Sequence, residues 1–357
     1  MVTVTQMAVP TAALIWLLSW RLPNHTLEFV TSLSLAALAV FVSYWSLWYI
    51  RRLFLNGSVD AQGKSVLITG CDTGLGHILA KQLAADGFFV YAGCLNATGE
   101  GAKMLRTVTN IEVLQLDVTK DADVEAACES VERTLGKREL WAVVANAGVP
   151  SLGYIEWQPM SRIQYVFQVN TFGVIRIARA FLPLMSKTAG SRLIIVTSLL
   201  GRMSMPASMT YCMSKHASTS LADSLRRQYY DRGVHVSTVE PGAYRTPMAN
   251  HDVMAATLRK DLSLLPPRVR SGISDHSLGS LRKSSDVLYS SIMRQDSQEA
   301  VDVMKSAVRD TLPKAYYRAG GVKDILLRRL YEVAPAEVTD EFVHMIRKVA
   351  RAARRKA

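Results

Sequence analysis

The first fifty residues are much more apolar than the rest of the chain. Residues 1–20 contain no charged side chain, and residues 29–50 form a second uncharged stretch. About twenty helical residues suffice to cross a hydrocarbon core of about 30 Å. Trp45, Trp48 and Tyr49 end the second stretch, and Arg51-Arg52 follow at once, as at a membrane interface. We therefore predict a membrane anchor over residues 1–55, with one or two hydrophobic segments.

The charges around these segments predict an orientation. The basic pair Arg51-Arg52 places the part that follows on the cytoplasmic side. The first segment could be a second span, a re-entrant helix or a signal sequence. No basic region precedes it, which argues against a cleaved signal peptide, and the lack of early arginines argues against a mitochondrial transit peptide. We expect the endoplasmic reticulum membrane, with a mitochondrial membrane as the alternative.

From residue 63 onward, short apolar runs alternate with helical patterns, which is typical of a doubly wound parallel α/β sheet of the Rossmann kind. We predict one such domain over residues 63–330, with a substrate lid after residue 246, and a basic tail over residues 331–357. The predicted helices are about 75–86, 121–135, 160–187 and 209–232. The predicted strands are 65–70, 88–93, 112–117, 140–148, 192–198 and 234–242, with a last edge strand at 314–320.

The net charge of +12 is unevenly distributed. Residues 347–357 hold six basic side chains and no acid, which suits contact with anionic lipid or simple solvation. The rest shows no basic stripe interleaved with aromatics, so we do not expect nucleic-acid binding. The four cysteines form neither a CxxC pair nor a metal-ligand spacing with histidine, so we predict reduced thiols and no metal site.

A glycine-rich segment lies where the first predicted strand turns into a helix. Gly70, Gly74 and Gly76 allow a tight turn and a close approach to a pyrophosphate, which the helix N-terminus would stabilise. Asp117 is expected to end the third strand, where it could meet an adenine or cap the next helix. The segment therefore predicts a dinucleotide site.

Tyr211 and Lys215 are four residues apart on a predicted helix, so their side chains share one face. Interconversion of an alcohol and a carbonyl needs a group that moves the hydroxyl proton. A phenol, with a pKa of about 10, is a weak base at neutral pH, and a nearby ammonium favours its ionised form. Ser198 should end a strand and could hydrogen-bond the reacting oxygen.

In their order and spacing, these motifs resemble the short-chain dehydrogenase/reductase family. The resemblance rests on TGCDTGLG at 69–76, ANAG at 145–148, Asn170, Ser198, YCMSK at 211–215 and PGAYRT at 241–246. It implies a proton-relay water held by Asn170, beside catalytic Ser198, Tyr211 and Lys215, and it implies homo-oligomers. Ala145 replaces an asparagine that many members carry. The implied cofactor contacts are Gly70, Cys71, Asp72, Gly74, Leu75, Gly76, Asp117, Val118, Asn146, Ala147, Gly148, Tyr211, Lys215, Pro241, Gly242 and Thr246.

A narrower resemblance is to the membrane-associated subgroup of this family. That subgroup includes type 2 17β- and 11β-hydroxysteroid dehydrogenases, retinol dehydrogenases and mitochondrial D-3-hydroxybutyrate dehydrogenase. The segments GFFVYAGCLN, LWAVVANAGV and LLGRM carry the similarity. It implies a small lipophilic alcohol or ketone as the substrate.

The predicted cofactor is NAD, with NADP less favoured. About twenty residues after the glycine loop, Cys94-Leu95-Asn96 offers neither an acid for a ribose hydroxyl nor an arginine for a 2′-phosphate. Asp72 in the loop should repel a phosphate, and no arginine is expected nearby. The leading hypothesis is therefore an NAD-dependent oxidoreductase that interconverts a secondary or lipophilic alcohol, of steroid or retinoid type, and its carbonyl.

Two alternatives remain open. Arg202, Arg245 and Arg259 could hold the carboxylate of D-3-hydroxybutyrate. A non-catalytic NAD(H)-binding membrane scaffold or sensor would need the glycines but not Asn170, Ser198, Tyr211 and Lys215. The apolar residues after 246, among them Met248 and Met254, could line a substrate pocket or simply pack a helix.

Overall fold

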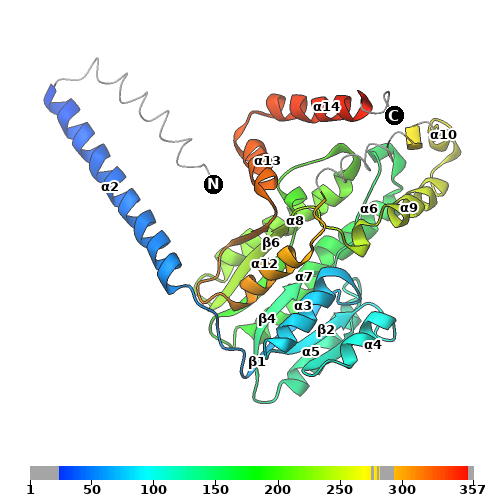
Figure 1. Cartoon of the computed structure of the whole chain (residues 1–357), viewed down its shortest axis with the longest axis horizontal. Coiled ribbons are helices and arrows are strands. Elements are labelled where there is room, and N and C mark those ends of the chain that lie inside the picture. The colour runs from blue at the N-terminus through cyan, green and yellow to red at the C-terminus, as the bar shows by residue number, and fades with distance from the viewer. Residues whose placement is uncertain (1–23, 275–276, 280, 282–292, 353–357) are drawn as a thin grey trace. The chain divides into compact units, whose positions relative to one another are not determined.

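The computed structural model describes residues 24–274, 277–279, 281 and 293–352. The chain forms two compact units, of which the first ends at Gly57 and the second begins at Ser58. Figure 1 traces both units from the N-terminus to the C-terminus.

The first unit contains one long helix, α2 (Asn24–Leu55). Within the described residues, its part Glu28–Leu55 is the one helix long and apolar enough to cross a membrane. Its apolar side chains point in all directions and are largely exposed, as expected of a helix that lies in lipid. The predicted first segment, residues 1–20, lies outside the described residues.

The second unit is built on a seven-stranded sheet in the order β3-β2-β1-β4-β5-β6-β7, with every neighbouring pair parallel. This confirms the predicted doubly wound fold. β7 is an edge strand, as predicted. The strands are β1 (Lys64–Thr69), β2 (Phe89–Cys94), β3 (Ile111–Gln115), β4 (Glu139–Ala145), β5 (Ser191–Val196), β6 (Val234–Pro241) and β7 (Tyr316–Ala319).

Several strands end earlier than the sequence pattern predicts. β3, β4 and β5 end at Gln115, Ala145 and Val196, two or three residues before the predicted ends at 117, 148 and 198. After β3 the apolar run continues past the last paired residue because Leu116 and Val118 are still buried in the core. Asp117, Asn146 and Ser198 consequently lie in loops beyond the carboxyl ends of their strands, not within them.

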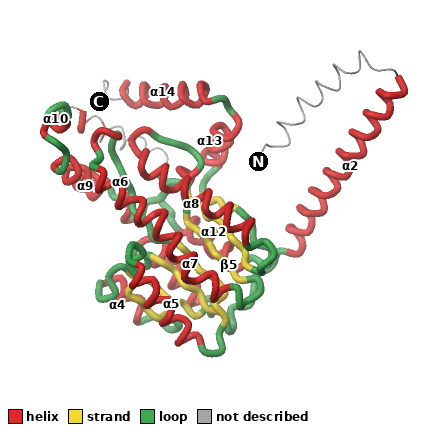
Figure 2. Tube along the Cα trace, turned by 180° about the vertical axis from the view of Figure 1, so that it is seen from behind, coloured by secondary structure: helices red, strands yellow, loops and turns green. Residues whose placement is uncertain are grey.

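The helices cover both faces of the sheet, as Figures 1 and 2 show. Alternate strand residues divide the core into two layers, because side chains along a strand point to opposite faces. Val66, Ile68 and Val90 pack with α3, α4 and α12, whereas Leu67, Leu193 and Ile195 pack with α5, α7 and α8. These helices are α3 (Gly74–Ala85), α4 (Glu100–Arg106), α5 (Asp121–Leu135), α7 (Gly173–Met185), α8 (Met209–Gln228) and α12 (Gln298–Arg309).

The predicted helix over 160–187 is interrupted. It consists of α6 (Met160–Phe167), a π-helical segment η2 (Gln168–Phe172) and then α7. Single π-helical turns within α-helices are frequent at functional sites. Asn170 lies in this wider turn, and its backbone carbonyl accepts a hydrogen bond from Ser218 Oγ on α8 (2.6 Å). The π turn therefore ties Asn170 to the helix that carries Tyr211 and Lys215.

The chain after β6 is mainly helical. It contains α9 (His251–Ser263), α10 (Pro267–Arg270), α13 (Val322–Val333) and α14 (Ala336–Ala352). The segment predicted as a basic tail is thus helical over most of its described length. A buried ion cluster holds α13 to the sheet, because Glu240 of β6 pairs with Arg202 (2.8 Å) and with Arg328 of α13 (2.7 Å).

Candidate active site

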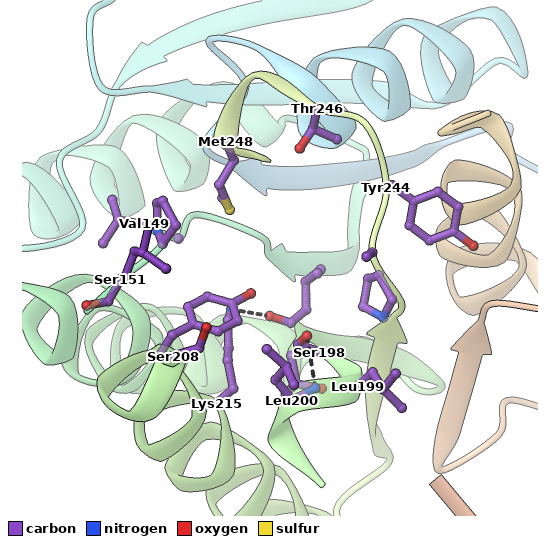
Figure 3. A pocket seen from close by; sticks show the side chains of 18 of the residues that line it. Val149, Ser151, Ser198, Leu199, Leu200, Ser208, Lys215, Tyr244, Thr246 and Met248 are labelled. Atoms are coloured by element: carbon purple, nitrogen blue, oxygen red, sulfur yellow. Dashed lines mark hydrogen bonds between the residues drawn. The ribbon is translucent and has the colours of Figure 1, made fainter. Parts of the chain in front are cut away.

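A cavity of about 850 Å³ lies beyond the carboxyl ends of the central strands. The loops after β1, β4, β5 and β6 line it, together with α8 and parts of the C-terminal segment. β1 and β4 lie side by side in the sheet although they are not consecutive in sequence. Ligands of open α/β sheets bind at such a switch point. Figure 3 shows the cavity with Ser198 and Lys215 on one side and Thr246 and Met248 on the other.

The glycine loop is packed against the loop after β4. Gly70 has a positive φ of 71°, and a Cβ added to it would lie 2.9 Å from the Cα of Ala147. A Cβ on Gly76 would lie 2.5 Å from the side-chain nitrogen of Asn146, which donates hydrogen bonds to the carbonyls of Thr69 and Gly70. Any side chain here would separate the two loops, so both glycines are required for close approach of the backbone.

Most of the predicted cofactor residues line the cavity, and two do not. Cys71 is fully buried, and its thiol donates to the carbonyl of Ile68 (3.2 Å), so this side chain belongs to the core. Gly76 lies behind Gly70 and acts through packing. The predicted residues that do line the cavity are Gly70, Asp72, Gly74, Leu75, Asp117, Val118, Asn146, Ala147, Gly148, Ser198, Tyr211, Lys215, Pro241, Gly242 and Thr246.

Asp72 has a structural partner that the sequence did not indicate. Its two carboxylate oxygens accept hydrogen bonds from the backbone N–H groups of Leu95 and Asn96, both 2.9 Å long. The acid thereby fixes the loop after β2. Arg106, at the end of α4, donates to the carbonyl of Ala97 in the same loop (2.6 Å). The expectation that no arginine lies nearby is wrong, because the unpredicted helix α4 brings Arg106 back to this loop.

The Asp117 side chain closes a short turn before α5. One of its oxygens accepts from both the N–H and the hydroxyl of Thr119 (3.0 and 2.7 Å). Burial raises the pKa of the Asp117 carboxyl, but the bonds from Thr119 and the charge of Lys120 outweigh it, so the pKa lies below its usual value. Asp117 lines the cavity, where it could meet an adenine, but it does not cap the next helix, because the N-cap residue of α5 is Lys120.

Tyr211, Lys215 and Ser198 meet at the floor of the cavity. The Lys215 ammonium lies 5.7 Å from the centroid of the Tyr211 ring, one helical turn away on α8, and donates to the carbonyl of Val196 (2.9 Å). Ser198 follows β5 directly, and its hydroxyl accepts from the N–H of Leu200 (3.1 Å). The strand end and the helix face thus place a phenol, an ammonium and a hydroxyl on one wall.

Lys215 is almost completely buried, and burial lowers the pKa of its ammonium from 10.5 to about 8. A desolvated ammonium interacts more strongly with a nearby anion than an exposed one does. Asn170 does not line the cavity; it lies behind Gly148. Its side-chain oxygen accepts from the N–H of Val149 (2.8 Å), and its amide donates to Ser214 (3.0 Å). A Cβ on Gly148 would lie within 3.4 Å of both Asn170 Oδ1 and Lys215 Nζ, so these two groups approach the same point.

The sequence analysis missed much of the cavity wall. Tyr154, Tyr165 and Met205 line it, as do Leu327 of α13 and Phe342 of α14. Nothing in their local sequence marks them, because their role depends on how distant segments fold back over the site. Met248 and Met254, proposed as part of a lid, also line the cavity, whereas Leu258, Leu262 and Leu265 pack in a separate cluster around Trp157.

Comparison with known proteins gives the family of this chain. The family model for short chain dehydrogenases matches residues 64–255. This chain belongs to the short-chain dehydrogenase family. Retinol dehydrogenase 7 of Rattus norvegicus is 36% identical over 279 residues, which are 77% of this chain and 86% of the relative. This short-chain dehydrogenase is therefore an oxidoreductase that acts on alcohols.

Further relatives differ in the substrates that their names give. The 17-beta-hydroxysteroid dehydrogenase type 6 of Bos taurus is 35% identical, covering 77% of this chain and 86% of its own. The mitochondrial D-beta-hydroxybutyrate dehydrogenase of Mus musculus is 36% identical, covering 62% and 66%. Among solved structures, a short-chain dehydrogenase/reductase from Burkholderia phymatum in complex with NAD has a TM-score of 0.62 and 21% identity, covering 76% of this chain and 94% of its own. That likeness confirms the fold.

Proposed function

We propose that this protein is a membrane-tethered, NAD-dependent dehydrogenase that interconverts a lipophilic secondary or retinoid-type alcohol and its carbonyl. One observation carries the proposal: Ser198, Tyr211 and Lys215 share the wall of a predominantly apolar cavity that also reaches the glycine loop. A dinucleotide suits this cavity because Gly70 and Gly74, both with positive φ, line it at the turn before α3, where the backbone and the helix N-terminus can approach a pyrophosphate. When bound, NAD supplies the hydride acceptor.

The protein groups divide the proton chemistry between them. The hydroxyl of Ser198 hydrogen-bonds the substrate oxygen, and the Tyr211 oxygen takes the hydroxyl proton in the oxidative direction. The Lys215 ammonium stabilises the phenolate that performs this step. Asn170, held by Val149 and Ser214 behind Gly148, orients the polar groups through which the proton would leave toward solvent.

The adenosine end of the site supports NAD over NADP. Asp72 lines the cavity with a carboxylate that would lie near any 2′-phosphate. Arg106 supports the alternative, since its side chain is exposed at the same loop, but its guanidinium is bonded to the Ala97 carbonyl. Asp72 disfavours a 2′-phosphate, whereas Arg106 favours one. We choose NAD because Asp72 lines the cavity and Arg106 does not.

The substrate end supports a lipophilic alcohol over hydroxybutyrate. Met203, Met205 and Met248 line it together with leucines and tyrosines. Arg202, Arg245 and Arg259, the candidates for binding a small carboxylate, are absent from the lining. Arg202 is paired with the buried carboxylate of Glu240, and Arg245 donates to Gln295. The relatives named for retinol and for a hydroxysteroid agree with this choice.

The proposed function includes a membrane anchor and a separate catalytic unit. α2 would hold the catalytic unit, residues 63–330, at the cytoplasmic face of the endoplasmic reticulum membrane, where a lipophilic alcohol concentrates. Homo-oligomer formation remains a prediction.

The test is NADH or NADPH formation by the detergent-solubilised protein. It would be offered NAD or NADP with estradiol, testosterone, retinol or D-3-hydroxybutyrate. Turnover of a lipophilic alcohol with NAD supports the proposal. Turnover of hydroxybutyrate alone would replace the substrate class. Inactivity with all four, combined with tight NAD binding, would favour a non-catalytic sensor.

A further inference from the structure

The inner face of α9 carries a carboxylate among apolar side chains. The buried residues of this helix follow a helical period: Met254, Leu258, Asp261 and Leu262. Asp261 is only 8% exposed, and burial raises the pKa of its carboxyl against the charges of Arg162 and Lys260. Burying a carboxylate is costly unless it is paired. A buried acid on an otherwise apolar face therefore calls for an explanation.

Its partner is Arg162 of α6, which contacts α9, the loop after β4 and Tyr165 of its own helix. Arg162 Nε lies 3.5 Å from Asp261 Oδ2, and both side chains are mostly buried. Its Nη2 donates to the carbonyl of Pro150 in the loop after β4 (2.6 Å), and its guanidinium lies 5.6 Å from the centroid of the Tyr165 ring. Pro150 and Tyr165 line the cavity, as does Met254 of α9. Arg162 itself does not line it.

Apolar packing alone would not fix α9 in one position. Leu258 and Leu262 pack against Trp157 in a small cluster, and such contacts are non-directional. A partly buried ion pair adds little net stability, because desolvation offsets much of the attraction. An arrangement in which Asp261 is buried without Arg162, however, contains an unpaired buried charge and is therefore strongly disfavoured. The ion pair therefore favours one position of α9 beside the cavity.

We infer that Arg162 is a positioning residue that latches α9 through Asp261 and the post-β4 loop through Pro150, and so completes the substrate end of the cavity. The inference rests on the proposed function, since it assigns α9 to the substrate. Weakening the latch should lower the population of the binding-competent arrangement. Substrate affinity falls in proportion to that population, whereas the NAD end of the cavity is untouched.

The experiment compares Asp261→Asn, Arg162→Gln and the double variant in the full-length, detergent-solubilised protein. We expect each single variant to raise KM for the alcohol by about tenfold, with KM for NAD and kcat changed by less than about twofold. The double variant should cost little more than Arg162→Gln alone, because Arg162→Gln already removes the contact with Asp261. Arg162→Lys keeps the cation and should restore part of the affinity.

Asp86→Asn is a matched control. Asp86 forms a partly buried ion pair with Lys305 and Arg309 between α3 and α12, and none of the three lines the cavity. Its loss should leave both KM values unchanged. A general loss of stability would affect the control and the latch variants alike. It would not raise KM for the alcohol more than KM for NAD.

Hydrogen exchange gives a second measurement that needs no turnover. In Asp261→Asn and Arg162→Gln, amides of residues 251–263 should exchange at least about fivefold faster, with those of α3 unchanged. Unchanged exchange in residues 251–263, or additive effects in the double variant, would overturn the latch. If the wild-type protein oxidises none of the alcohols, the proposed function fails, but the exchange result still decides whether Arg162 seats α9.

Discussion

Lys215→Met should make the protein more stable while abolishing its turnover. Burial lowers the pKa of the Lys215 ammonium from 10.5 to about 8. The difference corresponds to roughly 3 kcal/mol by which the folded state is destabilised when the group is charged. Methionine has a similar shape and carries no charge. Its substitution removes that cost and loses one hydrogen bond to Val196, worth about 1 kcal/mol. The net gain at pH 7 is about 2 kcal/mol.

The stabilisation by Lys215→Met should decrease as the pH rises. Below pH 8 the lysine is protonated in both the folded and the unfolded chain, so the full penalty is present. Between pH 8 and 10.5 the folded protein binds fewer protons than the unfolded chain, so wild-type stability rises with pH and the penalty disappears. The advantage of Lys215→Met should therefore fall from about 2 kcal/mol at pH 7 to less than about 1 kcal/mol at pH 9.5.

The assay is urea-induced unfolding of both proteins in the same detergent at pH 7 and pH 9.5, alongside NADH formation. The expected result is a higher unfolding midpoint for the variant at pH 7, a smaller difference at pH 9.5 and no measurable turnover. Equal or lower stability of Lys215→Met at pH 7 would contradict the reasoning. A gain of equal size at both pH values would show that the buried charge is not its cause.

Three further substitutions test other parts of the account. Glu240→Gln leaves the guanidinium groups of Arg202 and Arg328 without their shared carboxylate, so thermal unfolding should show a loss of about 3–5 kcal/mol; a loss under about 1 kcal/mol would contradict this. Gly76→Ala places a methyl 2.5 Å from Asn146 Nδ2 and should abolish measurable NAD binding in calorimetry, a result that wild-type affinity would refute. Asp72→Ala frees the N–H groups of Leu95 and Asn96, and we expect KM for NAD to rise about tenfold while KM for NADP falls. A parallel rise for both cofactors would show that Asp72 only shapes the loop.

The sequence predicted the parallel sheet well because buried parallel strands produce continuous apolar runs that stand out from helical patterns. The same property made strand ends less certain. Leu116 and Val118 extend the apolar run of β3 beyond its last paired residue, since both are still buried in the core. The strand in fact ends before Asp117, which lies in a loop where its carboxylate accepts from Thr119.

The candidate site was predictable where its residues are close in sequence. Tyr211 and Lys215 share a helix, and Gly70 and Gly74 share a turn, so local geometry brings each pair together. The bonds from the loop after β2 to Asp72, and the presence of Arg106 at that loop, were missed because the two elements meet it only in the folded chain. The C-terminal wall could not be predicted either. Leu327 and Phe342 reach the cavity because buried Glu240 holds α13 through Arg328, a pairing across 88 residues.

The most direct test of the central claim is Tyr211→Phe, assayed for NADH formation with the lipophilic alcohol that the wild-type protein oxidises, and for NAD binding by calorimetry. The substitution removes one oxygen from the cavity wall and leaves the ring in place. The account predicts that turnover falls by at least about a hundredfold while NAD affinity stays within about twofold. Turnover near the wild-type rate would contradict the assignment of Tyr211 as the acid/base group, and with it the proposed mechanism.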